Sequence, residues 1–227
     1  MRNLKLTIRY DGTDFQGWQT QPGFRTVQET IEAAIASITQ APKVRLNCAG
    51  RTDSGVHALG QVANVYTDST LSCETLIKAF NAKLPPDVAI LSCEDIHQAF
   101  CANKDAIGKR YRYVINDSRV SDPFLRRYSW QYQRRLNDEA MHRAAQYLVG
   151  RHDFRCFETN YPNRMTSVRT IADIAVNRKD ETVQIEVEAD GFLYNMVRAI
   201  TGTLSQVGRG YWPEEQVKTV LEAMDRR

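Results

Sequence analysis

The stretch Leu4-Lys5-Leu6-Thr7-Ile8-Arg9-Tyr10 alternates apolar and polar residues. An alternation with a period of two is typical of a strand that buries one face and exposes the other. The residues that follow, Asp11-Gly12-Thr13, favour turns. The sequence therefore predicts a half-buried first strand that ends at a turn.

The segment after this turn has the apolar spacing of a helix. Thr26 and Glu29 fit a capping box, and apolar residues then recur three or four positions apart, which predicts a helix from Val27 to about Thr39. The same two periodicities predict the other elements of this half, which are strands at 44–49, 61–66 and 88–93 and a helix at 72–82. The predicted order is β-α-β-β-α-β.

The same order begins again near Lys109. The expected elements are strands at 110–116, 168–176 and 182–189, and helices at 137–150, 193–207 and 213–227. Split β-α-β units usually carry four antiparallel strands with helices on one face. Since the second half supplies three, we expect its last C-terminal strand to be absent. We predict an α+β fold with two ferredoxin-like halves, 1–102 and 103–227, that share an antiparallel sheet, have helices on one face and leave a central cleft.

The composition is that of an ordinary globular protein. Of the 227 residues, 42% are hydrophobic and 25% charged, and no apolar run reaches the roughly 18 to 20 residues of a membrane helix. The N-terminus begins with strand-like alternation rather than a signal peptide, so we expect a cytoplasmic protein with no membrane association. The five cysteines form no C-x-x-C pair and have no histidine at metal-ligand spacing, which predicts reduced thiols and no metal site.

The net charge of +3 is small, but the basic residues are unevenly distributed. Between residues 101 and 170, Lys and Arg outnumber Asp and Glu, and most basic residues are arginines. A guanidinium pairs with phosphate oxygens through two hydrogen bonds and stacks on bases. Charge alone leaves two interpretations open, which are an RNA or other phosphate-rich partner and a solvated surface.

Residues 50–58, with the sequence GRTDSGVHA, form a loop with glycines on both sides of an aspartate. Glycines permit unusual backbone angles, and a loop held between two strands can present a carboxylate to a substrate. Local chemistry slightly favours another role, in which Asp53 forms an Asx turn with its own backbone. We interpret His57 as a structural residue of this loop.

The segment Ala49 to Ala58 resembles the catalytic motif of the TruA family of tRNA pseudouridine synthases. Further motifs resemble the family in the same order, and they are Arg9-Tyr10-Asp11-Gly12-Thr13 with Phe15, Gly17-Trp18-Gln19 and Gln21, then Arg25 to Glu29, Lys109 to Tyr113, Gly150 to Phe154, and Phe192 to Arg198. The resemblance covers residues 4 to about 212, and this ordered set makes coincidence an inadequate explanation.

The resemblance implies isomerisation of uridine to pseudouridine at positions 38 to 40 of the tRNA anticodon stem-loop, without a cofactor. It implies that Asp53 is the nucleophile and that Arg198 is its cationic partner. Arg198 lies in an otherwise apolar run, where an unpaired charge is costly, so we expect it to be paired and partly buried. Tyr111 is implied to pack on the target base and to accept its C5 proton. Without the motif, Tyr111 would be interpreted as a core residue and Arg198 as a surface residue of its helix.

The resemblance also implies contacts with RNA and a homodimer. Arg51 is implied to fill the space that the target base leaves when it is flipped out of the stem. Strand alternation puts Lys109 and Tyr111 on one face and Arg110 and Arg112 on the other, where they can meet phosphate or acidic neighbours. The other basic side chains expected to position the RNA backbone include Arg126 and Arg164.

Two other functions compete with this one. A module of the same architecture could bind RNA without catalysis, but such a relative would be expected to lose Asp53, Tyr111 or Arg198, and all three are present. A glycosidic hydrolase would need a second carboxylate beside Asp53, and the motif offers none. The sequence favours the synthase.

Overall fold

The computed structural model describes residues 1–159 and 166–225. The chain divides into two compact units, Met1–Ala106 and Ile107–Arg227. The strands form two separate hydrogen-bonded sheets of four and five strands. The α+β class is therefore confirmed, but the prediction of one shared sheet is wrong, because each set of strands pairs only within its own unit among the described residues.

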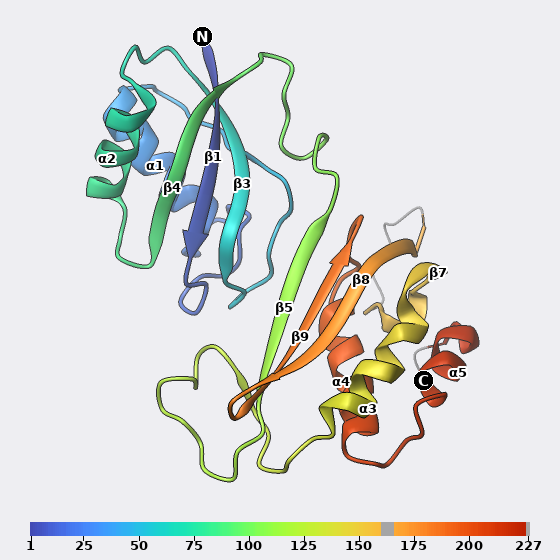
Figure 1. Cartoon of the computed structure of the whole chain (residues 1–227). Helices are drawn as coiled ribbons and strands as arrows, with labels where there is room; N and C mark the ends of the chain where they lie inside the picture. Colours follow the sequence, from blue (N-terminus) through green and yellow to red (C-terminus); the bar gives the residue numbers. More distant parts are fainter. Residues whose placement is uncertain (160–165, 226–227) are drawn as a thin grey trace. The chain divides into compact units, whose positions relative to one another are not determined.

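The first unit is a four-stranded antiparallel sheet with two helices (Figure 1). In chain order its elements are β1 (Arg2–Tyr10), α1 (Val27–Thr39), β2 (Asn47–Cys48), β3 (Ala58–Thr67), α2 (Cys73–Lys83) and β4 (Val88–Ile96). The strand order is β2-β3-β1-β4, and α1 and α2 lie on the same side of the sheet. This is the predicted ferredoxin-like arrangement.

Strand β1 buries the face that its alternation predicts. Leu4, Leu6 and Ile8 are fully buried and pack in one apolar core with the buried faces of α1 and α2. The predicted capping box of α1 is wrong, because Thr26 makes no side-chain cap hydrogen bond. The first amides of the helix bind main-chain carbonyls instead: Val27 donates to Gly17 at 3.2 Å and Gln28 to Trp18 at 3.0 Å. These bonds satisfy the first two amides of α1, whereas a capping box would have bound the amide of Glu29.

The second unit has a five-stranded sheet in the order β6-β5-β9-β8-β7. Its elements are β5 (Lys109–Asn116), β6 (Trp130–Gln131), α3 (Asp138–Ala145), β7 (Gly150–Asp153), β8 (Val168–Lys179), β9 (Thr182–Ala189), α4 (Met196–Gly208) and α5 (Gln216–Ala223). Helices α3 and α4 pack against each other, with α3 against β8 and α4 against β5 (Figure 1). Strand β6 is parallel to β5, and the other pairs are antiparallel.

Within the described residues, the second half carries five strands rather than the three predicted. The additional strands, β6 and β7, have two and four residues, which is too short for a period of two to be recognised. The predicted helix at 137–150 merged three elements: α3 ends at Ala145, a 3-10 turn follows at Gln146–Leu148, and β7 begins at Gly150, whose φ of +107° suits glycine. No helix in residues 1–159 and 166–225 combines the length and apolar character needed to cross a membrane.

Candidate active site

The loop that carries Asp53 joins β2 to β3 and is held to the core of the first unit. The hydroxyls of Thr52 and Tyr10 lie 2.8 Å apart, and Tyr10 is only 2% exposed. The carbonyl of Thr52 accepts a hydrogen bond from the Trp18 amide at 3.0 Å. Side chain and backbone of Thr52 are therefore both anchored, while the next residue, Asp53, is exposed.

Two glycines let another segment approach this loop closely. A Cβ added at Gly12 would lie 2.0 Å from the carbonyl oxygen of Val56, and one added at Gly17 would lie 2.8 Å from that of Thr52. Carbon and oxygen atoms in van der Waals contact are more than 3 Å apart, so neither position has room for a side chain. The glycines of residues 12–18 are therefore part of how the Asp53 loop is positioned.

A tight turn follows the aspartate. The Val56 amide donates to the Asp53 carbonyl at 3.2 Å, and Gly55 has a φ of +75°, as in a type II turn. The hydroxyl of Ser54 and the amide of Gly55 both donate to the Phe15 carbonyl, each at 3.2 Å. The carboxyl group of Asp53 is thus carried on a main chain that is hydrogen-bonded on both sides.

His57 links the end of the loop to the turn after β1. Its Nδ1 atom is 3.1 Å from the Gly12 amide and 3.0 Å from a carboxylate oxygen of Asp11. The two contacts are alternatives, because Nδ1 accepts the amide proton when it is unprotonated and donates to the carboxylate when it is protonated. Either contact ties residues 11–12 to the Asp53 loop, which is a structural role.

Tyr111 lies on β5 in the second unit. Its ring and that of Phe192 meet edge to face, with centroids 4.8 Å apart. Tyr111 is half-buried, as are Lys109 and Tyr113 on the same face of the strand. Phe192 precedes α4, so the aromatic contact joins two of the motifs that the sequence singled out.

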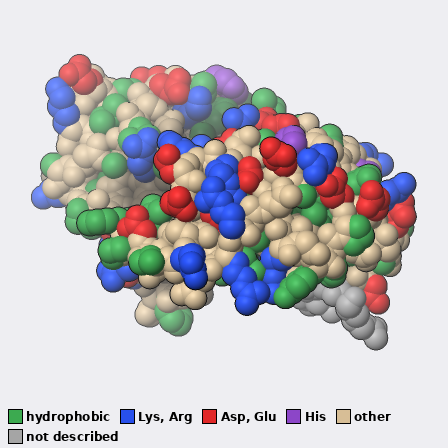
Figure 2. Space-filling model, turned by 60° about the horizontal axis from the view of Figure 1, so that its bottom comes forward, with side chains coloured by type: hydrophobic (Ala, Val, Ile, Leu, Met, Phe, Trp, Pro, Cys, Tyr) green, Lys and Arg blue, Asp and Glu red, His purple; other side chains and the backbone are tan. Residues whose placement is uncertain are grey.

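Arg110 and Arg112, on the opposite face of β5, meet acidic neighbours. Each is directly opposite a glutamate of β9, Arg110 across from Glu188 and Arg112 across from Glu186. Arg110 Nη2 is 2.5 Å from Glu188, a hydrogen bond that raises the arginine's pKa, and Arg112 Nε donates to Glu186 at 2.6 Å. Figure 2 shows the same mixture of Lys or Arg with Asp or Glu side chains across one face of the molecule.

Arg198 is exposed, and the expectation that it is partly buried is wrong. Met196, Ile200 and Leu204 form the buried stripe of α4, and a residue two positions after Met196 points away from that stripe. Within residues 1–159 and 166–225, Arg198 makes no hydrogen bond or ion pair. The apolar run around it reflects one face of a helix rather than a buried environment for the charge.

The other predicted contacts with RNA are distributed over both units. Arg51 belongs to the first unit, and Arg126 to the segment between β5 and β6; both are exposed. Arg164 lies outside the described residues. In the part of the chain that the structure describes, no three His, Cys, Asp or Glu side chains are grouped as metal ligands would be.

The supporting contacts of Tyr10, Gly12 and Thr52 were not predicted from the sequence. Tyr10 and Gly12 belong to the first motif, but their partners are more than forty positions away along the chain. The signal that could have found them is the glycine content of residues 12–17 beside a strand end, which indicates close approach of two backbone segments.

The family model described as tRNA pseudouridine synthase matches residues 6–104 and 144–227. The chain belongs to the tRNA pseudouridine synthase family. Relatives include tRNA pseudouridine synthase A of Acetivibrio thermocellus, 45% identical over 100% of this chain and 93% of the relative. That of Thermoanaerobacter sp. is 42% identical over 100% and 92%, and tRNA pseudouridine synthase A 2 of Clostridium perfringens is 42% identical over 100% and 93%.

The family assignment predicted from the motifs is thus confirmed, and with it an isomerase. The ranges matched by the tRNA pseudouridine synthase model include Asp53 and Arg198, whereas Tyr111 falls between them. The similarity to the relatives covers the whole chain, so Tyr111 lies within the aligned region there.

Proposed function

We propose that this chain isomerises uridine to pseudouridine at positions 38 to 40 of the tRNA anticodon stem-loop, with Asp53 as the nucleophile. The observation that supports Asp53 most strongly is its setting, an exposed aspartate on a loop whose neighbours are hydrogen-bonded to the core. A nucleophile must be held in place and yet reach a substrate, and this arrangement meets both needs.

The reaction breaks the N1–C1′ bond, turns the uracil and joins C5 to C1′. The C5 proton leaves and N1 gains one, so atoms and electrons balance without an oxidant or reductant. Asp53 supplies an electron pair to form a temporary covalent bond to the nucleotide, and that bond breaks again, returning the pair to the carboxylate, when C5 joins C1′. Tyr111, with its edge-to-face contact to Phe192, packs on the base and accepts the C5 proton.

Arg198 is proposed to orient the carboxylate of Asp53. Its guanidinium is exposed and makes no ion pair in the described part of the chain, so it is available to another carboxylate. Arg51, exposed two residues before Asp53, is proposed to occupy the space vacated by the flipped base. Lys109 and Arg126 are proposed to contact phosphates, whereas Arg110 and Arg112 would first have to leave Glu188 and Glu186.

The test uses a tRNA whose uridines carry tritium at C5, because formation of the new bond releases that label. We expect the purified protein to release tritium without an added cofactor, and Asp53→Asn to abolish release while tRNA binding persists. Asp68→Asn is the matched control, since Asp68 is exposed in the same unit and, within the described residues, forms an ion pair only with the N-terminal amine. Normal turnover by Asp53→Asn would refute the mechanism, and binding without release by the unaltered protein would indicate the non-catalytic RNA-binding alternative.

We also propose that the protein acts in the cytoplasm as a homodimer whose two subunits contact one tRNA. The support is the family alone. Light scattering at micromolar concentration is expected to give twice the mass of the chain. An active monomer at that concentration would refute the homodimer.

A further inference from the structure

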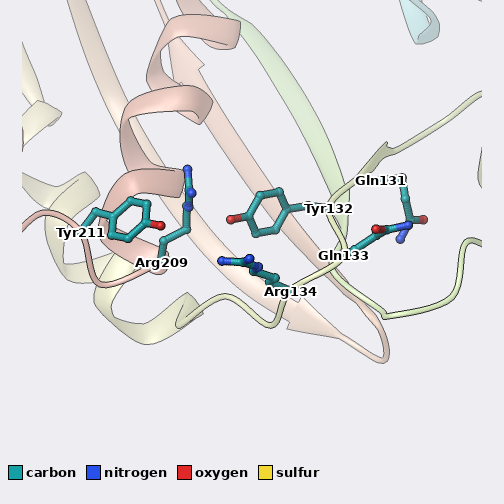
Figure 3. A pocket seen from close by; sticks show the side chains of 6 residues that line it. All are labelled: Gln131, Tyr132, Gln133, Arg134, Arg209 and Tyr211. Atoms are coloured by element: carbon teal, nitrogen blue, oxygen red, sulfur yellow. The ribbon is translucent and has the colours of Figure 1, made fainter.

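A concave surface at the C-terminal end of α4 is built from aromatic and cationic side chains. The cavity has a volume of about 470 Å³ and is lined by Gln131, Tyr132, Gln133, Arg134, Arg209 and Tyr211. Figure 3 shows Arg209 between the rings of Tyr211 and Tyr132, with Arg134 beside them. We refer to these six residues as the arginine–tyrosine pocket. Its size falls within the range of about 300 to 1,000 Å³ that small-ligand sites occupy.

The end of α4 positions one wall of this pocket. Gly210, with a φ of +73°, donates its amide to Val207 at 2.8 Å, and the Tyr211 amide donates to Gln206 at 3.0 Å. These two bonds are those of a Schellman motif, which turns the chain back over the last helical turn. The ring of Tyr211 thereby comes to lie 4.1 Å from the guanidinium carbon of Arg209.

The opposite wall follows strand β6. The Tyr132 amide donates to Asn116 at the end of β5 at 2.7 Å. The Tyr132 ring centroid is 5.4 Å from that of Trp130 and 5.8 Å from the guanidinium carbon of Arg209. Trp130, Tyr132, Arg209 and Tyr211 therefore form a continuous row of planar groups.

The two arginines of the pocket differ from their neighbours in charge pairing. Other arginines nearby are bound to carboxylates: Arg135 to Glu181, Arg143 to Glu214, and Arg178 to Asp117 and Asp138. Arg134 and Arg209 have no carboxylate partner within the described residues. The helix dipole stabilises a cation at the C-terminal end of α4. This accounts for the position of Arg209, but it explains neither Arg134 nor the aromatic row.

We propose that the arginine–tyrosine pocket binds one unpaired nucleotide of the tRNA, with its phosphate between Arg134 and Arg209 and its base on the ring of Tyr211. Two guanidinium groups without a carboxylate partner among the described residues suit a phosphodiester, and Tyr211, a residue that is 62% exposed, offers a stacking face. Gln131 and Gln133 can donate to or accept from base edges. The tRNA as ligand rests on the proposed function, whereas the RNA-binding chemistry rests on the pocket itself.

The first test compares salt dependence of tRNA binding by the full chain. The double variant Arg134→Gln/Arg209→Gln is expected to bind about tenfold more weakly at moderate salt and to reduce the slope of log affinity against log salt by about 1, because the one phosphate held between the two guanidinium groups is no longer neutralised. Arg135→Gln is the matched control, since its guanidinium is already paired with Glu181; it should leave the slope unchanged. An unchanged affinity and slope in the double variant would overturn the proposal.

The second test separates stacking from charge. Tyr211→Leu should weaken binding severalfold without changing the salt slope, because a base–aromatic contact releases no counterions. Arg209→Lys keeps the charge at the helix end, so it should retain the slope. A variant that changed the sedimentation coefficient of the protein and not its tRNA affinity would show that the surface binds a second copy instead.

Turnover distinguishes this proposal from the catalytic one. At saturating tRNA the double variant should release tritium at the unaltered rate, so that KM rises while kcat is constant. If the unaltered protein bound tRNA through this pocket with the expected slope but released no tritium, the proposed function would fail and the pocket assignment would stand. A loss of kcat with normal affinity would overturn the pocket assignment.

Discussion

Replacing Gly12 by alanine should move Asp53 while leaving its carboxyl group chemically unchanged. The added Cβ would lie 2.0 Å from the Val56 carbonyl oxygen, whereas such contacts lie above 3 Å, so one of the two backbones must shift by about 1 Å. Val56 closes the turn that begins at Asp53. A misplacement of about 1 Å in a reacting group costs on the order of a hundredfold in rate, and we expect that loss in kcat.

Gly60→Ala is the matched control for this substitution. Gly60 lies on β3, beyond the same loop, and its added Cβ would have no neighbour closer than 3.8 Å. Neither Gly12 nor Gly60 has a positive φ, so the two changes differ in clearance rather than in backbone strain. Tritium release gives kcat and KM, and thermal unfolding reports whether each variant is folded. A folded Gly12→Ala protein whose kcat stays within twofold of the control would refute the positioning role of the glycine.

Three further outcomes are expected. Tyr111→Phe keeps the ring contact with Phe192 but removes the hydroxyl, so kcat should fall by about a hundredfold or more with tRNA affinity unchanged; normal turnover would exclude Tyr111 as the proton acceptor. Arg178→Met removes the main partner of the fully buried carboxylate of Asp117 and should lower the free energy of unfolding by about 3 to 5 kcal/mol. Urea denaturation measures this change. The control is Arg198→Met, which should change the free energy of unfolding by less than about 0.5 kcal/mol. Burial raises the pKa of Asp117, but hydrogen bonds from Arg178 and from the Leu136 amide outweigh it, and the net pKa lies below the usual 3.8. The stabilisation from the Asp117 carboxylate should therefore be complete above about pH 5 and be lost as the pH falls below about 4. Equal stability in denaturation at pH 6 and pH 3 would contradict this.

The sequence predicted the regular elements well where one face is buried. Alternation along β1 and the helical spacing of α1 placed both elements close to their observed bounds. The predictions failed for β6 and β7, whose few residues carry no recognisable period and whose existence depends on a neighbouring strand. The capping box was also wrong: Thr26 makes no cap hydrogen bond, and the carbonyls of Gly17 and Trp18 bind the first two amides of α1.

The candidate site likewise has features that the sequence predicted and features that only the folded structure shows. The motifs were sufficient to place the chain in its family and to select Asp53 as the candidate nucleophile. They could not show that Gly12 and Gly17 provide clearance for the Asp53 loop, or that Arg198 is exposed. Both facts depend on residues far apart in the chain or on the orientation of a whole helix.

What the sequence determined by itself is local: the periodicity of each strand and helix, and an ordered set of motifs around Asp53. The tertiary structure decided which charges are already neutralised. Arg110 and Arg112 are bound to glutamates of β9, while Arg134 and Arg209 meet in one pocket without a carboxylate partner among the described residues. The physical reason is that a charge's availability depends on its neighbours across a sheet or at a helix end, and those neighbours are adjacent only after the chain has folded.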